Sequence, residues 1–263
     1  MPRIWVPSNE LAADGGDAAP GTSTGASGQL APETIRLDGE AHRYLSRVLR
    51  VAVGAAVDVF DGRGREATTT VERVGPRDLI LRVVERRTVE RRATPPVTLL
   101  QGLARAERMD LVVQKAAELG AARVVPVRAA RSASGQQARL ERWDRIAREA
   151  ARQCGRAELL DVAPLVSLEA AVAAEQGALA AGGVGIVPWE EEPDAPSLSS
   201  LVPPAPTSVT VLIGPEGGLT SDEVAAATAA GFRVATLGPR ILRTETAAIA
   251  ALAVIQSRVG GLG

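Results

Sequence analysis

Two glycine–proline loops near the C-terminal end constrain the fold of this chain more than any other feature. The first loop is Ile213–Thr220, which reads Ile-Gly-Pro-Glu-Gly-Gly-Leu-Thr, and the second is Leu237–Thr246. Each follows an apolar run of strand character, Val209–Ile213 and Arg233–Leu237, and each leads into a pattern with helical spacing. Strands that alternate with helices form a mostly parallel sheet, which binds ligands at the carboxyl ends of its strands. The sequence therefore predicts an α/β fold in which the two loops lie side by side and build a backbone-lined pocket.

The same alternation extends over the C-terminal two thirds of the chain. Further strands are expected at Val97–Leu103, Val124–Val127 and Gly183–Val187. Helices are expected at Met109–Leu119, Ala138–Gln153, Leu168–Glu175 and Ala247–Val259. The last helix is apolar on nearly every side, so we expect it to be buried on more than one face, in a dimer interface or beneath other parts of the chain.

The N-terminal third shows a different pattern. Short alternating runs separated by turn signals predict a small antiparallel β-barrel, with strands at Thr34–Leu37, Ala56–Phe60, Arg65–Arg73 and Leu79–Glu90. A helical segment, Gly39–Arg50, interrupts these runs, and a short strand is expected at Arg3–Val6. The low-complexity stretch Ser8–Pro32 is expected to be a mobile loop.

The change of pattern indicates two domains, residues 1–92 and 93–263, joined by the charged segment Arg91–Pro96. The net charge is only −1, but arginines crowd the first domain. A basic region on a nearly neutral protein is typical of a localised polyanion site; solvated surface arginines are the alternative.

The chain has one cysteine and one histidine, and these low counts exclude several classes of site. The one cysteine, Cys154, excludes an intramolecular disulfide and a cysteine-based metal cluster, and we expect it to be buried in a helix. The one histidine, His42, argues against a histidine-ligated zinc site. The chain has no apolar run near the roughly 18 residues of a membrane span and no apolar leader. We therefore expect a cytoplasmic protein without a metal.

The glycines of the first loop have two interpretations. Gly214, Gly217 and Gly218 let the backbone approach a ligand closely, or they serve only a tight turn. Neither loop has the lysine of a Walker phosphate loop or the glycine spacing of the dinucleotide fingerprint. The expected ligand is one whose base is read by backbone N–H and C=O groups.

Two helix starts and one aromatic residue complete the local predictions. Thr220, with Glu223 three residues later, predicts a capping box for the helix after the first loop. Thr244 or Thr246 is expected to cap the last helix. Trp189, beside a proline-rich loop, is a candidate platform for stacking a base.

Five colinear segments resemble one known family. The two loops closely resemble those of the bacterial 16S ribosomal RNA uridine-N3 methyltransferases of the SPOUT, or α/β-knot, superfamily. Glu107–Gly120 and Glu149–Arg156 resemble the first two helices of its methyltransferase domain. Pro2–Ile4 and His42–Arg50 resemble its PUA-like RNA-binding domain. The likeness covers nearly the whole chain except Ser8–Pro32 and the loops around residues 193–206.

The resemblance departs from the family pattern at two positions. Arg105 stands where a lysine is common, and Arg43 stands where a second histidine is common. Both substitutions keep a donor for phosphate.

The resemblance implies a fold and an activity. The fold is a C-terminal, mostly parallel sheet with a deep trefoil knot, preceded by a PUA-like β-barrel. The activity is S-adenosylmethionine-dependent methylation of N3 of a uridine in 16S ribosomal RNA, free or within the small subunit, by a homodimer. The candidate cofactor contacts are Leu212, Gly214, Glu216, Gly217, Gly218, Leu237, Gly238, Ile241, Leu242 and Thr246.

The chemistry of the transfer selects further candidates, because uridine N3 is a poor nucleophile while it keeps its proton. Arg240 or Arg243 is a candidate to stabilise the uracil anion or to hold RNA phosphate, and Glu216 or Glu245 to accept the proton. Capping and loop bonding are the alternative roles of both glutamates. Arg156 is a candidate RNA or active-site residue. The candidate RNA contacts are Arg3, His42, Arg43, Arg47 and Arg50.

Three other functions remain open at this level. One is another SPOUT specificity, such as ribose 2′-O or transfer-RNA methylation, and a second is a non-catalytic RNA-binding protein. The third, a nucleotide-binding module, lacks its fingerprint. The sequence leaves open which uridine is modified, whether the substrate is free RNA or an assembled subunit, which residue is the base, and whether the 8–32 insertion has any role.

Overall fold

The computed structural model describes residues 1–11, 34–89, 94–132 and 139–262. The chain divides into two compact units, one formed by Met1–Arg91 with Gly155–Glu158 and the other by Arg92–Cys154 with Leu159–Gly263. Most of the expected mobile loop and part of the expected linker lie outside the described residues. In the described part no helix is long and apolar enough to cross a membrane.

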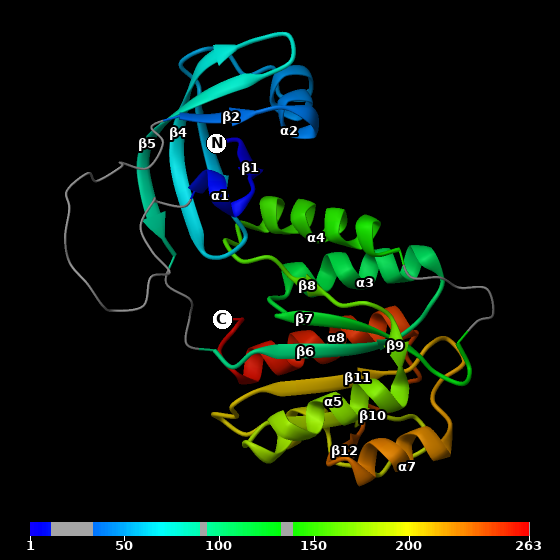
Figure 1. Ribbon diagram of the computed structural model, residues 1–263. Coiled ribbons are helices and arrows are strands. Elements are labelled where there is room, and N and C mark those ends of the chain that lie inside the picture. The colour runs from blue at the N-terminus through cyan, green and yellow to red at the C-terminus, as the bar shows by residue number, and fades with distance from the viewer. Residues whose placement is uncertain (12–33, 90–93, 133–138, 263) are drawn as a thin grey trace, which may run out of the picture. The chain divides into compact units, whose positions relative to one another are not determined.

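The first unit is built around one curled five-stranded sheet (Figure 1). Across the sheet the strands are β1 (Arg3–Trp5), β3 (Ala56–Phe60), β4 (Arg65–Val74), β5 (Leu79–Thr88) and β2 (Thr34–Leu37). The β1–β3 pair is parallel and the other pairs are antiparallel. Alternate side chains of these strands point inward, as in Val57 and Val59 of β3, and form one core.

Two short helical segments accompany this sheet. Ser8–Leu11 forms helix α1, whose Leu11 is buried in the core, so the expectation of a loop beginning at Ser8 is wrong for these four residues. The expected helix at Gly39–Arg50 is a helical turn, α2 (Gly39–Arg43), that continues as a π-helix, η1 (Tyr44–Val48). It ends earlier than expected because Arg50 adopts a left-handed conformation, with φ of 53°.

The second unit contains a seven-stranded sheet in which every pairing is parallel, as the alternation of strands and helices predicts. The strands are, in order, β12 (Phe232–Ala235), β10 (Val184–Pro188), β11 (Val209–Ile213), β6 (Val97–Gly102), β7 (Arg123–Arg128) and β8 (Asp161–Val162), with β9 (Val166–Ser167) also paired to β7. The two strands that precede the glycine–proline loops, β11 and β12, are therefore not neighbours. β10 lies between them, which corrects the expectation that the loops lie side by side.

Helices cover both faces of this sheet (Figure 1). One face packs in a hydrophobic cluster with α3 (Ala106–Glu118), α4 (Leu140–Cys154), α6 (Leu198–Leu201) and α8 (Thr244–Arg258). The other face packs with α5 (Leu168–Ala180) and α7 (Ser221–Ala229). Trp143 of α4 is fully buried in the first cluster, whereas Cys154 at the end of α4 is exposed, so the expectation of a buried cysteine is wrong.

The last helix begins earlier than its apolar pattern suggests. α8 starts at Thr244, its N-cap is Arg243, and no side chain caps it, so the prediction of a threonine cap is wrong. Ala248, Leu252 and Ile255 are buried along one side of α8, and other apolar residues such as Ile249 and Val254 are half-buried.

The predicted capping box of α7 is confirmed. The Thr220 hydroxyl accepts a hydrogen bond from the Glu223 N–H at 3.2 Å, and the Glu223 carboxylate accepts one from the Thr220 N–H at 2.9 Å. The other oxygen of Glu223 accepts a hydrogen bond from the Ala130 N–H at 2.7 Å. The start of α7 is thereby tied to the loop after β7.

Replacing Thr220 by alanine is expected to lower the free energy of unfolding by about 1 kcal/mol, because an N–H at the start of α7 loses its acceptor. Thr228→Ala, in the same helix, is the matched control. Its hydroxyl donates to the Val224 carbonyl within α7, so its loss is expected to be close to neutral. Urea unfolding measures both variants; equal losses would contradict the role of the capping box.

Candidate active site

The carboxyl ends of β6 and β11 are joined to the start of α8 by a buried chain of hydrogen bonds. Gln101 is fully buried at the end of β6, and its Nε2 donates to the Thr244 hydroxyl at 2.9 Å. That hydroxyl donates in turn to the carbonyl of Gly214 at 2.6 Å. Thr244, expected from its sequence position to be a cap, instead holds the first loop against the last helix.

Gly102, next to Gln101, allows the first loop to approach β6. A Cβ added at Gly102 would lie 2.3 Å from the backbone nitrogen of Pro215, so no other residue fits without a shift of the loop. A glycine at the end of an apolar strand pattern is a signal for such a close approach, and it could have been found from the sequence.

The first loop is also packed tightly against the segment after β7. A Cβ added at Gly217 would lie 2.8 Å from the Cβ of Arg131 and 2.9 Å from its carbonyl oxygen. The Arg131 guanidinium donates to the carbonyls of Gly217 and Leu219, both at 3.3 Å. The packing of the chain alone therefore requires a glycine at position 217.

The guanidinium of Arg108, in α3, lies close to both candidate proton acceptors, Glu216 and Glu245. Its Nη1 lies 3.2 Å from Oε1 of Glu216, and its Nε lies 3.8 Å from Oε2 of Glu245. Oε1 of Glu216 also accepts a hydrogen bond from the Arg105 N–H at 2.9 Å. Sequence reasoning did not single out Arg108, because an arginine at the start of an amphipathic helix has no distinguishing pattern.

The two glutamates differ in how fully they are bonded. Oε2 of Glu245 is buried and has no hydrogen-bond partner among the described residues, although the Arg108 guanidinium is near it. Glu216 is held by a backbone N–H and by the same guanidinium. Oε1 of Glu216 is thus engaged twice, whereas Oε2 of Glu245 is a buried acceptor without a hydrogen-bond donor.

A pocket of about 120 Å³ opens at the carboxyl ends of β10 and β12. Its walls are the loop after β10 and the second glycine–proline loop, with one residue of α8: Pro188, Trp189, Glu190, Pro193, Thr236, Leu237, Gly238, Pro239, Arg240, Ile241, Leu242 and Ala247. No residue of the first loop lines this pocket, because β10 and its loop stand between the two glycine–proline loops.

The structure places the expected cofactor contacts in three different situations. Leu237, Gly238, Ile241 and Leu242 line the pocket. The first-loop residues and the exposed Thr246 do not line it, and Leu212 is fully buried in the core. Glu190, which sequence reasoning missed, connects the pocket to the first loop, since its Oε1 lies 2.9 Å from the position of a Cβ on Gly218.

Gly238 and Ile241 give the pocket its open side. Gly238 has φ of 104°, and nothing lies within 4 Å of the position where its Cβ would stand. Ile241 is 85% exposed, which is unusual for so large an apolar side chain. An apolar surface of this kind is available to cover a flat apolar ligand.

The remaining candidate residues are divided between the two units. Arg240 lines the pocket, and Arg243 is exposed just before α8. Arg156 belongs to the segment Gly155–Glu158, which is part of the first unit.

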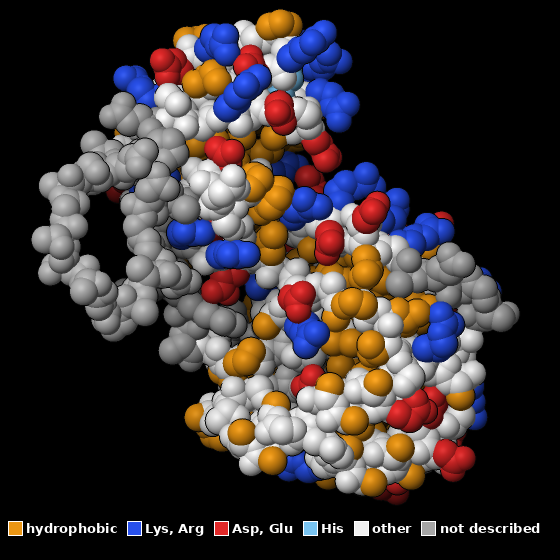
Figure 2. Space-filling view, viewed as in Figure 1, with side chains coloured by type: hydrophobic (Ala, Val, Ile, Leu, Met, Phe, Trp, Pro, Cys, Tyr) orange, Lys and Arg blue, Asp and Glu red, His pale blue; other side chains and the backbone are white. Residues whose placement is uncertain are grey.

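Three of the candidate RNA contacts, Arg43, Arg47 and Arg50, are exposed on the helical segment of the first unit. Figure 2 shows arginine side chains, in blue, gathered over the part of this unit that carries α2. His42 is instead buried, with its Nε2 3.0 Å from the carbonyl oxygen of Gly75.

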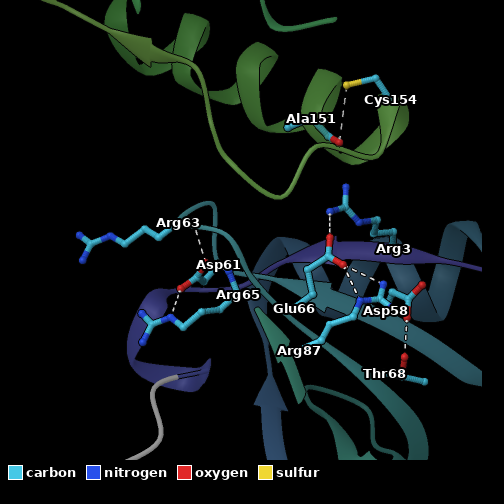
Figure 3. Close-up of polar contacts among 10 residues, drawn as sticks. All are labelled: Arg3, Asp58, Asp61, Arg63, Arg65, Glu66, Thr68, Arg87, Ala151 and Cys154. Atoms are coloured by element: carbon cyan, nitrogen blue, oxygen red, sulfur yellow. Dashed lines mark hydrogen bonds and ion pairs between the residues drawn. The ribbon is translucent and has the colours of Figure 1, made fainter. Parts of the chain in front are cut away.

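Arg3 is also engaged within its own unit (Figure 3). Its guanidinium forms an ion pair with Glu66, which also pairs with Arg87 at 2.7 Å. The Cζ atom of Arg3 lies 4.0 Å from the centroid of the Phe60 ring, which is a cation–π contact. Arg3 thus neutralises a buried carboxylate.

Thr244→Val is expected to lower the free energy of unfolding by about 1–3 kcal/mol, because the Gly214 carbonyl loses its hydroxyl donor and the Gln101 amide keeps only the Gly102 carbonyl as an acceptor. Thr246→Val is the matched control, since Thr246 is exposed two residues further along α8. Its effect is expected to stay within about 0.5 kcal/mol. Equal effects in guanidinium unfolding would show that the buried chain of hydrogen bonds does not hold this edge together.

Comparison with known proteins places these two units in one family. Residues 91–256 match the model of an RNA methyltransferase domain, and residues 37–84 match that of an RNA methyltransferase PUA domain. The ribosomal RNA small subunit methyltransferase E of Mycobacterium bovis is 36% identical over 224 residues, which cover 83% of this chain and 84% of the relative.

Other relatives agree. The methyltransferase of the same name from Bacillus subtilis is 31% identical and covers 84% of this chain and 89% of its own. The crystal structure of the Neisseria gonorrhoeae enzyme of that name, bound to S-adenosyl methionine, is similar with a TM-score of 0.80, at 29% identity and over 98% of this chain and 97% of that chain. The chain therefore belongs to the RNA methyltransferase family that includes the ribosomal RNA small subunit methyltransferases E.

Proposed function

We propose that this protein transfers a methyl group from S-adenosylmethionine to N3 of a uridine in 16S ribosomal RNA. The observation that carries the proposal is the union, in one chain, of a PUA domain and an RNA methyltransferase domain whose second loop borders a pocket. The relatives named for methylation of small-subunit ribosomal RNA supply the substrate class.

The pocket residues fit an adenosyl group. Leu237, Ile241 and Leu242 offer apolar contact for an adenine ring, and the open side of Gly238 lets the backbone lie against it. S-adenosylmethionine supplies an electrophilic methyl group when it is bound. The protein has to hold the uracil ring in line with that group, and positioning of this kind supplies much of the rate.

We propose Glu245 as the acceptor of the N3 proton. A uridine N3 becomes a nucleophile when its proton leaves, so the proton must pass to a nearby base as the N–C bond forms. Glu245 has a buried oxygen without a hydrogen-bond partner, whereas Oε1 of Glu216 already accepts the Arg105 N–H. Arg108 holds both carboxylates and thereby orients the free oxygen.

The negative charge that develops on the uracil carbonyl oxygens needs a positive partner. Arg240 lines the pocket and Arg243 is exposed at the start of α8, two residues before Glu245. We propose that one of them stabilises this charge and the other holds a phosphate of the RNA. Arg43, Arg47 and Arg50 of the first unit are proposed to bind RNA phosphates further along the substrate, since all three are exposed.

Several finer features belong to the same proposal. The hydrogen bonds from Thr244 to the first loop support a trefoil knot in which the C-terminal segment passes beneath that loop. The half-buried Ile249 and Val254 of α8 support a homodimer that covers them. We also propose that the curled sheet of the first unit is a PUA-like barrel and that the enzyme works in the cytoplasm on 16S RNA or on the small subunit.

Cells that lack this gene are expected to lose one 3-methyluridine from 16S ribosomal RNA, and the gene supplied in trans is expected to restore it. Mass spectrometry of nuclease-digested RNA measures the change. An unchanged modification profile would contradict the proposal. Loss of a ribose 2′-O-methyl group would contradict the N3 assignment alone.

Glu245→Gln is expected to slow methyl transfer by about 100-fold or more at saturating cofactor, because the amide cannot accept the N3 proton. The dissociation constant for S-adenosylmethionine is expected to stay the same. The deficit is expected to shrink as the pH rises, since N3 then loses its proton to solvent. Single-turnover kinetics and calorimetry measure these effects. A larger loss of rate in Glu216→Gln than in Glu245→Gln would reverse the assignment.

A further inference from the structure

The strand order places one acidic side chain at the cofactor pocket. β10 lies between β11 and β12, so the loop after β10 stands between the two glycine–proline loops. This loop carries the acidic run Glu190, Glu191 and Glu192, of which only Glu190 lines the pocket. Its neighbour Trp189 lines the pocket as well.

The Glu190 carboxylate lies at the place where the pocket meets the first loop. Its Oε1 is 2.9 Å from the position that a Cβ on Gly218 would occupy, and Gly218 has φ of 73°. A side chain at position 218 would therefore push the carboxylate away. Among the described residues no group forms a hydrogen bond or an ion pair with this carboxylate, so both of its oxygens are available to a ligand.

The groups around Glu190 indicate which part of the cofactor it meets. Leu237, Ile241 and Leu242 form the apolar wall suited to adenine. The ribose is the group joined directly to adenine, and it carries two adjacent hydroxyls. A carboxylate accepts two hydrogen bonds in a geometry that suits such a diol, as acidic residues do in dinucleotide-binding folds.

We propose that Glu190 accepts hydrogen bonds from the 2′- and 3′-hydroxyls of the ribose of S-adenosylmethionine and so selects the ribonucleoside. This inference rests on the proposed function, because it needs the cofactor in the pocket between β10 and β12. The loop after β10 would then recognise the ribose, a contact that neither glycine–proline loop provides. A site with a paired acceptor of this kind rejects a ligand that lacks the hydroxyls.

The test compares Glu190→Gln with Glu191→Gln, which makes the same change of charge one residue away and outside the pocket lining. Calorimetry measures the binding of S-adenosylmethionine. Displacement of S-adenosylmethionine measures the binding of 5′-methylthioadenosine, which keeps the adenine and the diol but lacks the sulfonium and the amino-acid part. Thermal unfolding establishes that both variants are folded.

Glu190→Gln is expected to weaken both ligands by a similar factor of about ten or more, and Glu191→Gln is expected to change neither. Weaker binding of S-adenosylmethionine with unchanged binding of 5′-methylthioadenosine would show that Glu190 meets the ammonium or sulfonium group, which overturns the inference. Unchanged binding of both ligands would also overturn it. If the unaltered protein binds no S-adenosylmethionine at all, the proposed function itself fails.

Discussion

The Thr244 hydroxyl, held between Gln101 and the Gly214 carbonyl, is the interaction on which the arrangement of the active site depends. It joins three segments that are far apart in the sequence: the end of β6, the first loop and the start of α8. Because the Gln101 side chain is fully buried, the loss of a hydrogen-bond partner there is costly, and this cost holds the three segments together. The absence of a side chain at Gly102 makes this close approach possible.

The two glycine–proline loops have different tasks. The first is held by its own chain, with Gly217 against Arg131 and Glu216 against Arg108. The second has an open side, where Gly238 faces empty space and Ile241 is exposed. The roles proposed above follow from this difference: the held first loop would fix the Glu216 carboxylate, and the open second loop would receive the adenosyl group.

Much of the fold could be predicted from the sequence because it follows from local patterns. Alternating strands and helices predicted the parallel sheet, and Thr220 with Glu223 predicted the capping box. The order of the strands could not be read in this way. That order places β10 between the two loops and gives Trp189 and Glu190 their positions at the pocket.

The residues that sequence reasoning missed owe their positions to tertiary contacts. Arg108 has no motif of its own and matters because Glu216 and Glu245 meet it from two other segments. Cys154 has the surroundings of a buried helix residue in the sequence but lies exposed at the last position of α4. Thr244 is a residue type that often caps helices, yet its hydroxyl donates to the Gly214 carbonyl of the first loop and does not cap its own helix.

The most direct test of this account is a crystal structure of the protein with S-adenosylmethionine. We predict that the adenine lies against Leu237, Ile241 and Leu242, and that the hydrogen bond from Thr244 to the Gly214 carbonyl is unchanged. We also predict that the methyl group points toward Glu245. Cofactor density away from the loops after β10 and β12 would contradict the account.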